Sequence, residues 1–289
     1  MKIAILLTCH NRITKTKKCI HNLEVALNAF QINDYQIYLT DDGSTDGTGE
    51  WVVQNTKNAT VLYSDGTLFW AKGMYNSWKE ALKNDYDYYL LLNDDTELVE
   101  DSFKILFDTI EYSKNKFSKQ GLAIGGTKGH NDELSYSGAL IVNKFLYTQK
   151  RLTPNGEYQS AEIANANIML VPKEVVTSIG IINNKYAHGM ADYDYSYNAH
   201  INNFPVIICP EYCGICDYDH DNPYNKFKQL NLKGRIKMLK NPLGLDFISH
   251  FTFLKRFFPY RAPFVFGFAW FKVLLPNVYY GLLKLRGWK

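Results

Sequence analysis

Short apolar runs alternate with amphipathic stretches along the first 125 residues of the chain. The apolar runs predict buried strands at residues 2–8, 35–40, 60–63, 88–92 and 122–124. The stretches between them predict helices at residues 15–30, 48–55, 71–83 and 102–114. Because strands alternate with helices, we expect an α/β fold with a Rossmann-like, mostly parallel sheet and helices on both of its faces.

The pattern changes after residue 125. Residues 133–149 and 164–172 predict antiparallel or edge strands, whereas residues 191–203 predict a helix that is followed by a strand at 204–210. Beyond residue 225 the chain becomes basic and rich in aromatic residues. We therefore expect a main domain over residues 1–225 and a C-terminal helical extension over residues 226–289.

Charge is divided unevenly between these two parts. Residues 226–289 hold 13 Lys and Arg and one acid, Asp246, whereas the remaining residues hold 19 bases and 28 acids. An uneven distribution of this kind indicates that the tail meets an anionic surface. Residues 262–283 are apolar, but Pro263, Lys272 and Pro276 interrupt them, and a spanning helix needs about 20 apolar residues. We expect helices that lie in a membrane interface, and the alternative is a helical pair that packs on the main domain.

Cysteine usage and the N-terminal residues bear on the compartment. The chain has five cysteines, an odd number, and its first residues, "MKIAILLTCHNR", form an apolar run too short for an export signal. Both features predict a reducing compartment. Together with the basic tail, they predict a cytoplasmic protein at the inner face of the cell membrane. The tail's long apolar runs suit lipid better than nucleic acid.

Three polar clusters follow predicted strands: residues 8–12 ("TCHNR"), 40–48 ("TDDGSTDGT") and 93–96 ("NDDT"). The carboxyl ends of parallel strands lie at one edge of a sheet, where ligands bind. The adjacent Asp94 and Asp95 repel each other, and a divalent cation is a common reason to keep two carboxylates together. Oxygen ligands favour Mg²⁺ or Mn²⁺. The alternative is an acidic turn that caps the following helix.

Four segments in order, "LLTCHNR", "LTDDGSTDGT", "LLLNDDTEL" and "HGMADYDYSYNAHINNFPV", resemble the signature segments of family 2 glycosyltransferases. The resemblance covers residues 2–220 and implies the GT-A fold and an inverting, nucleotide-sugar-dependent activity. The segment "DGTLFWAKGMYNSW" is most similar to rhamnosyltransferase-like bacterial members.

The resemblance also implies roles for individual residues. The donor nucleotide would be bound by Thr8, His10, Asn11, Arg12, Asp42 and Asp94. Asp95 would ligate Mn²⁺ or Mg²⁺, and His220 would complete the metal shell. Trp70, Lys72 and Asn167 would contact the donor sugar or the acceptor. Asn93 stands where many members have Asp.

In the fourth segment, Asp192 lies at the position of the family's catalytic base. Ala191 stands where the family usually has Glu, and Asp194 is the alternative base. The two residues would not share a helix face. The base would take the proton of the acceptor hydroxyl, while the metal would neutralise the leaving diphosphate.

A second motif predicts different chemistry. Cys209, Cys213, Cys216 and His220 have a spacing that could bind zinc or an iron–sulfur cluster. The alternative is that these cysteines are small buried apolar residues.

These observations predict a transferase that moves a sugar from a UDP- or dTDP-sugar to a saccharide or lipid-linked saccharide in cell-surface polysaccharide synthesis. One rival is a sugar-phosphate nucleotidyltransferase, which needs a glycine-rich basic loop that "TCHNR" lacks. The other is a non-catalytic zinc- or membrane-binding module.

Overall fold

The structure, a computed structural model, describes residues 1–218 and 224–285. It divides into two units, which we treat separately. The first comprises residues 1–184 and 191–218, and the second comprises residues 185–190 together with residues 219–289. The second unit therefore includes a short loop from within the main part of the chain as well as the basic tail.

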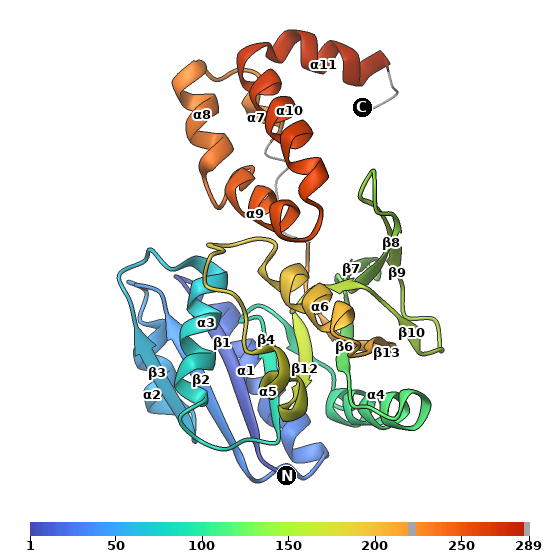
Figure 1. The fold of residues 1–289 in the computed structure, drawn as a ribbon. Coiled ribbons are helices and arrows are strands. Elements are labelled where there is room, and N and C mark those ends of the chain that lie inside the picture. Colours follow the sequence, from blue (N-terminus) through green and yellow to red (C-terminus); the bar gives the residue numbers. More distant parts are fainter. Residues whose placement is uncertain (219–223, 286–289) are drawn as a thin grey trace. The chain divides into compact units, whose positions relative to one another are not determined.

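A mixed sheet forms the centre of the first unit (Figure 1). Its strands follow the order β3 (Ala59–Tyr63), β2 (Tyr35–Asp41), β1 (Ile3–Cys9), β4 (Tyr88–Leu92), β12 (Ile168–Pro172), β6 (Leu122–Lys128), β13 (Val206–Ile215) and β10 (Gln159–Ser160). Neighbours from β3 to β4 are parallel, as are β6 and β13. β12 runs antiparallel to both β4 and β6. Its first residues therefore lie beside the carboxyl end of β4.

Two further strands join the main sheet, and three strands form a separate, smaller sheet. β5 (Glu97–Leu98) pairs with β13, and β7 (Leu134–Tyr136) pairs with β6. A smaller sheet has the order β11 (Ile163–Ala164), β8 (Gly138–Asn143) and β9 (Thr148–Leu152).

Helices cover both faces of the main sheet (Figure 1). On one face, α1 (Ile13–Ala29), α2 (Thr48–Asn55) and α4 (Ser102–Phe117) pack with the strands into one apolar cluster. The other face carries α3 (Phe69–Ala81), α5 (Lys173–Ile179) and α6 (Ala191–Ile201). On that face Trp78 of α3 contacts Tyr89 and Tyr195, with ring centroids 5.8 and 5.1 Å apart.

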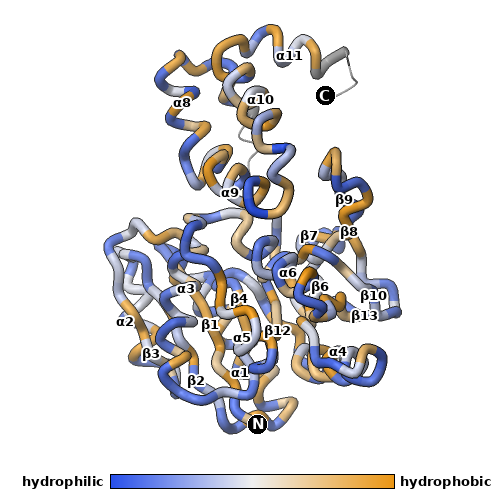
Figure 2. Tube along the Cα trace, in the orientation of Figure 1, coloured by the Kyte–Doolittle hydropathy of each residue, from blue (hydrophilic) through white to orange (hydrophobic). Residues whose placement is uncertain are grey.

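The two covered faces explain why strand sequences are continuously apolar. Every residue of β1 is buried, because its alternate side chains point into opposite apolar layers. Figure 2 shows β1, β4 and β12 in hydrophobic colours. The predicted fold, a GT-A-like α/β sheet that is mostly parallel with helices on both faces, is confirmed. A strand was predicted at residues 204–210, whereas β13 begins at Val206 and continues to Ile215.

The second unit is helical. It contains α7 (Tyr224–Phe227), α8 (Leu232–Lys240), α9 (Phe247–Phe257), a 3₁₀ turn (Pro259–Arg261), α10 (Ala262–Leu274) and α11 (Pro276–Leu285). Its apolar centre comprises Phe227, Leu239, Ala269 and Val273. The Asp246 carboxylate accepts a hydrogen bond from Gly189 N at 2.9 Å, which joins the 185–190 loop to the start of α9.

Over the described residues, no single helix of the chain is both long enough and apolar enough to cross a membrane. Residues 259–274 and 276–282 meet that test only as a pair, and the pair is bent by 115°.

We expect the second unit to lose stability as the pH falls from about 6.5 to 4. Burial, together with the nearby charges of Arg261 and Lys272, lowers the pKa of His250 in α9 from 6.5 to about 4. Between these values the unfolded chain binds a proton that the folded chain does not bind, so the free energy of unfolding decreases as the pH is lowered. The free energy of unfolding should drop by about 1–2 kcal/mol from pH 6.5 to pH 5.

Urea titration at each pH, followed by hydrogen exchange of the α9 peptides, measures this change. His250→Gln should remove most of the pH dependence, whereas His21→Gln, on the exposed surface of α1, should leave it unchanged. An equal pH dependence in the wild type and the His250 variant would contradict the assignment.

Candidate active site

Hydrogen bonds join the loops that follow β1 and β2. Asn11 Oδ1 accepts from Thr45 N at 2.7 Å, and Asn11 N donates to Ser44 Oγ at 2.9 Å. Asp46 Oδ2 accepts from Ile13 N at 2.9 Å, which ties the second loop to the start of α1. The predicted polar clusters at residues 8–12 and 40–48 therefore form one surface at the carboxyl edge of the sheet.

The acidic pair after β4 joins the same surface through Arg12. Arg12 Nη1 lies 2.7 Å from Asp95 Oδ2 and 3.4 Å from Asp94 Oδ1. Thr16 Oγ1 donates to Asp94 Oδ2 at 3.2 Å. Burial and the neighbouring Asp95 carboxylate raise the pKa of Asp94 to about 7, even though Arg12 and Thr16 oppose that shift. The positive charge of Arg12 therefore does not fully offset the burial and repulsion of the pair.

This donor set fits a divalent cation. Two adjacent carboxylates supply hard oxygen ligands, and burial and mutual repulsion, which raise the pKa of Asp94, are what a bound cation would offset. Asp95 is the more accessible of the two, since its side chain is 16% exposed against 7% for Asp94. Over residues 1–218 and 224–285, no group of three or more His, Cys, Asp or Glu side chains is arranged to hold a metal. The predicted ligand His220 lies outside the described residues.

Asp192 lies in the first turn of α6. Asn165 Nδ2 donates to Asp192 Oδ2 at 3.2 Å. Burial raises the pKa of Asp192, while the hydrogen bonds from Tyr193 N and Asn165 lower it. Asp194, the alternative base, is only 2% exposed, whereas Asp192 is partly exposed. Of the two residues, Asp192 is the more exposed.

The segment that precedes β12 connects Asp192 with the acidic pair. Asn93 N donates to Asn167 O at 3.1 Å, which places the segment against the end of β4. Asn167 Nδ2 lies 3.6 Å from Cys216 Sγ, and that sulfur lies 3.6 Å from Asp95 Oδ1. Residues 165–167 therefore lie between the predicted metal ligand and the predicted base.

Two of these contacts were not predicted from the sequence. Asn165 and Asn167 both lie in the stretch "ANAN", and it is Asn165 that contacts Asp192. Cys216 was grouped with the other cysteines, yet its thiol contacts Asp95. Asn167 is 5% exposed and its amide donates to the thiol, so its predicted contact with the donor sugar or the acceptor stays a prediction.

The predicted nucleotide-binding residues differ in accessibility. Thr8 is buried against Gly73 of α3. A side chain at position 73 would clash with the Thr8 hydroxyl group. Asp42 is 3% exposed, and its carboxylate accepts three backbone hydrogen bonds, from residues 66, 68 and 69. His10 is exposed, and its Nδ1 lies 2.6 Å from Asp42 O. Thr8 and Asp42 therefore shape the loops, whereas His10, like Asn11 and Arg12, is exposed.

Trp70 and Lys72 belong to the first turns of α3. Trp70 Nε1 donates to Asn93 Oδ1 at 2.7 Å, which holds the indole beside the acidic motif. Lys72 is exposed on the same helix. Their contacts with the donor sugar or the acceptor stay predictions.

The cysteines lie in different surroundings. Cys209 and Cys213 are fully buried on β13 within the apolar cluster, and Thr109 Oγ1 lies 3.2 Å from Cys209 Sγ. Cys216 follows the strand and turns towards Asp95. All five cysteines are free thiols. This arrangement favours the interpretation as buried thiols over a shared cysteine metal site.

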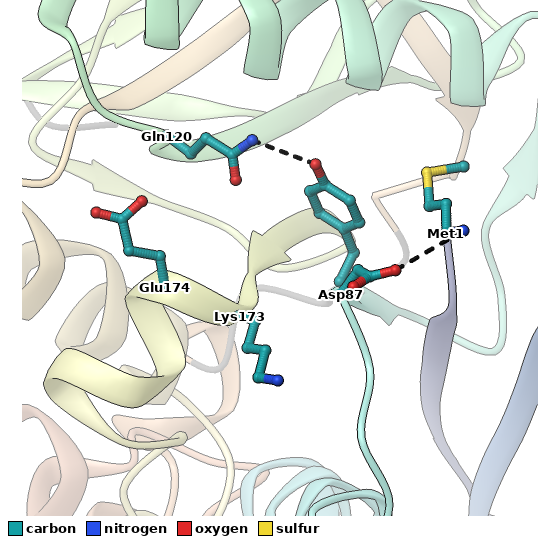
Figure 3. A pocket seen from close by; sticks show the side chains of 6 residues that line it. Met1, Asp87, Gln120, Lys173 and Glu174 are labelled. Atoms are coloured by element: carbon teal, nitrogen blue, oxygen red, sulfur yellow. Dashed lines mark hydrogen bonds and ion pairs between the residues drawn. The ribbon is translucent and has the colours of Figure 1, made fainter.

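Two hollows in the first unit differ in their relation to the acidic pair. One of about 170 Å³ is lined by Asp95 and Cys216 together with Lys15, Lys18 and His130. The other lies at the amino end of β4, where Gln120 Nε2 donates to the Tyr88 hydroxyl at 3.3 Å and Asp87 pairs with the N-terminus (Figure 3). The second hollow lies at the opposite end of β4 from the acidic pair and belongs to no predicted site.

Comparisons with known proteins bear on the family and the fold of the chain. The family described as glycosyl transferase family 2 matches residues 4–164. No curated protein sequence matches the chain. Among solved structures, TarS residues 1–349 from S. aureus is similar with a TM-score of 0.53 and 13% identity, over 89% of this chain and 73% of that one. A mannosyltransferase from Pyrobaculum calidifontis, solved in complex with GDP-Man and Mn²⁺, has a TM-score of 0.55 and 11% identity, over 92% of this chain and 73% of that one.

Proposed function

The chain belongs to glycosyl transferase family 2, and from this premise we propose that it is an inverting enzyme that uses a nucleoside diphosphate sugar. The donor is a UDP- or dTDP-sugar, and the acceptor is a hydroxyl group of a saccharide or lipid-linked saccharide in cell-surface polysaccharide synthesis. The observation that carries the proposal is the pair Asp94–Asp95 at the same sheet edge as the partly exposed Asp192. A single displacement needs a cation to neutralise the leaving diphosphate, which the carboxylate pair would hold, and a separate base for the acceptor hydroxyl.

Asp192 acts as the general base in this proposal. The acceptor oxygen attacks the anomeric carbon, the bond from that carbon to the diphosphate breaks, and the hydroxyl proton passes to Asp192. Burial raises the pKa of Asp192 and so makes it a stronger base than an exposed aspartate, while Asn165 holds its carboxylate in place. A single displacement from the opposite side inverts the configuration of the anomeric carbon, and no covalent intermediate forms on the chain.

Asp95 would hold the divalent cation, with Asp94 beside it. When bound, Mn²⁺ or Mg²⁺ would supply Lewis acidity to the departing diphosphate. Arg12 now pairs with Asp95, so it has to release that carboxylate before Asp95 can act as a ligand. The released guanidinium, on a half-exposed side chain, is then free to bind phosphate oxygens.

His10 binds the nucleotide from the β1 loop. Its exposed ring is held on both sides, because Nδ1 lies 2.6 Å from the Asp42 carbonyl oxygen and Nε2 lies 3.2 Å from Asn11 Nδ2. We expect His10→Ala to weaken the binding of UDP or dTDP about tenfold, the loss of roughly one hydrogen bond. Isothermal titration calorimetry with each nucleotide, in the presence of Mn²⁺, measures this change.

His21→Ala, on the exposed surface of α1, is the matched control and should bind as the wild type does. Product analysis by NMR then tests the transfer itself, since inversion gives the opposite anomeric configuration to that of the donor. A wild-type chain that binds no nucleoside diphosphate, with or without Mn²⁺, would overturn the proposed function.

A further inference from the structure

Helix α10 is apolar around almost its entire circumference. Its sequence, "APFVFGFAWFKVL", contains a single charged residue, Lys272, and that side chain is 8% exposed. A helix that is apolar on all sides is normally enclosed by protein or by lipid. Only part of α10 is enclosed by the helices of its own unit.

One side of α10 packs inside the second unit. Ala269 and Val273, four residues apart, belong to the small apolar centre with Phe227 and Leu239. These positions are 6% exposed or less. The buried side therefore fixes which way the helix faces.

The opposite side of α10 is exposed and aromatic. Phe264 and Phe268, one turn apart, are 65% and 62% exposed, and with Phe271 they line an open, apolar hollow. On α11, Val278 and Leu282 are each about half exposed. We call Phe264, Phe268, Phe271, Val278 and Leu282 the apolar face. The tube of α10 and α11 is coloured mainly from pale to orange (Figure 2).

The charge of the same unit indicates what would cover this face. Residues 226–289 contain 13 bases and one acid, and that acid, Asp246, already accepts a hydrogen bond from Gly189. Lys233, Lys237 and Lys240 on α8 are exposed. An apolar aromatic face on a unit with this excess of basic residues complements a surface that has an apolar interior and an anionic rim, as an anionic lipid bilayer has.

We propose that the apolar face is a docking surface for an anionic lipid bilayer. Phe264 and Phe268 enter the acyl boundary, while the excess of basic residues in the unit attracts it to the anionic headgroups. Val278 and Leu282 favour lipid over nucleic acid, because aliphatic side chains cannot stack on bases. In this arrangement α10 and α11 lie on the bilayer surface.

This surface is independent of sugar transfer, so the two proposals can fail separately. The test is co-sedimentation of the full chain with vesicles of phosphatidylcholine, with and without phosphatidylglycerol. The wild type should bind the anionic vesicles, and its binding should weaken with salt. Phe264→Ser/Phe268→Ser should reduce the partition coefficient at least about thirtyfold, because two largely exposed rings lose their contact with the acyl boundary.

The chain offers a matched control. Phe145 and Leu146, between β8 and β9 in the first unit, are 68% and 58% exposed. Phe145→Ser/Leu146→Ser removes a comparable apolar surface and should leave vesicle binding unchanged. Lys233→Ala/Lys237→Ala should weaken binding to the anionic vesicles and reduce the dependence on phosphatidylglycerol. Both serine variants replace exposed residues, and matching thermal unfolding curves would establish that each one is folded.

Three results would overturn the proposal. The wild type could fail to sediment with anionic vesicles. The Phe264/Phe268 variant could bind vesicles as tightly as the wild type. That variant could also lose a dimer seen in the wild type by light scattering while vesicle binding is unchanged, and the face would then be a contact between copies of this chain.

Discussion

Replacing Asp192 by Asn is expected to lower kcat for sugar transfer about a thousandfold. The amide has nearly the shape of the carboxylate and can still contact Asn165, but it cannot accept the proton of the acceptor hydroxyl. The KM for the donor should change little, because Asp192 acts on the acceptor. The measurement is the rate of nucleoside diphosphate release with saturating donor and acceptor.

The pH dependence of the wild-type rate provides a second test of the same role. A general base works only when it is deprotonated, so the rate falls as the pH drops through its pKa. Because burial raises the pKa of Asp192, the acid limb should lie above the range of an exposed aspartate. Asn165→Ala removes a hydrogen bond that lowers this pKa, so it should shift the acid limb to higher pH while much of the maximal rate is retained.

Asp194→Asn is the informative comparison, since Asp194 is two residues away and 2% exposed. If Asp194→Asn abolished transfer while Asp192→Asn left kcat and the acid limb unchanged, the base would be Asp194. Ala191, which the family resemblance aligns with the usual Glu, is completely buried at the start of α6, so the position before the proposed base belongs to the core here.

The sheet was predictable because its strands are buried on both faces. A strand such as β4, with four of its five residues buried, must be apolar at successive positions, and such runs are visible in the sequence without knowledge of their partners. The alternation of these runs with helices then restricts the topology. The convergence of the polar clusters at residues 8–12, 40–48 and 93–96 follows from the parallel order alone.

The contacts within the site were not predictable in the same way. Arg12 meets Asp95 across 83 positions of sequence, and that pairing depends on the register of β1 against β4 and on where α1 begins. The Asp42 carboxylate accepts hydrogen bonds from the backbone of the 66–69 loop. No periodic pattern in the sequence specifies the path of that loop. Cys216 departs from Cys209 and Cys213 because β13 ends at Ile215, so Cys216 lies beyond the strand that buries the other two.

Replacing Asp95 by Asn should lower kcat roughly a thousandfold and remove the effect of Mn²⁺ on nucleotide binding. Asp95 is the more accessible of the two adjacent carboxylates, and an amide is a much weaker ligand for a hard cation. Calorimetry with UDP and dTDP, each with and without Mn²⁺, separates binding from the chemical step. Asp217→Asn is the matched control, because Asp217 lines the same hollow and the substitution removes the same charge. Retention of Mn²⁺-dependent binding in Asp95→Asn would contradict the assignment.

Arg12→Ala should act in the opposite direction on the metal. The Arg12 guanidinium now lies 2.7 Å from Asp95 and competes with any cation for that carboxylate. Without it, we expect Mn²⁺ to bind the chain about tenfold more tightly in the absence of nucleotide, as measured by electron paramagnetic resonance of free Mn²⁺. Transfer should nevertheless be slower, because the same side chain is lost as a partner for the diphosphate. Tighter binding of Mn²⁺ combined with slower transfer would separate this role from simple neutralisation of the acidic pair, whereas unchanged affinity for Mn²⁺ would show that Arg12 does not compete for the site.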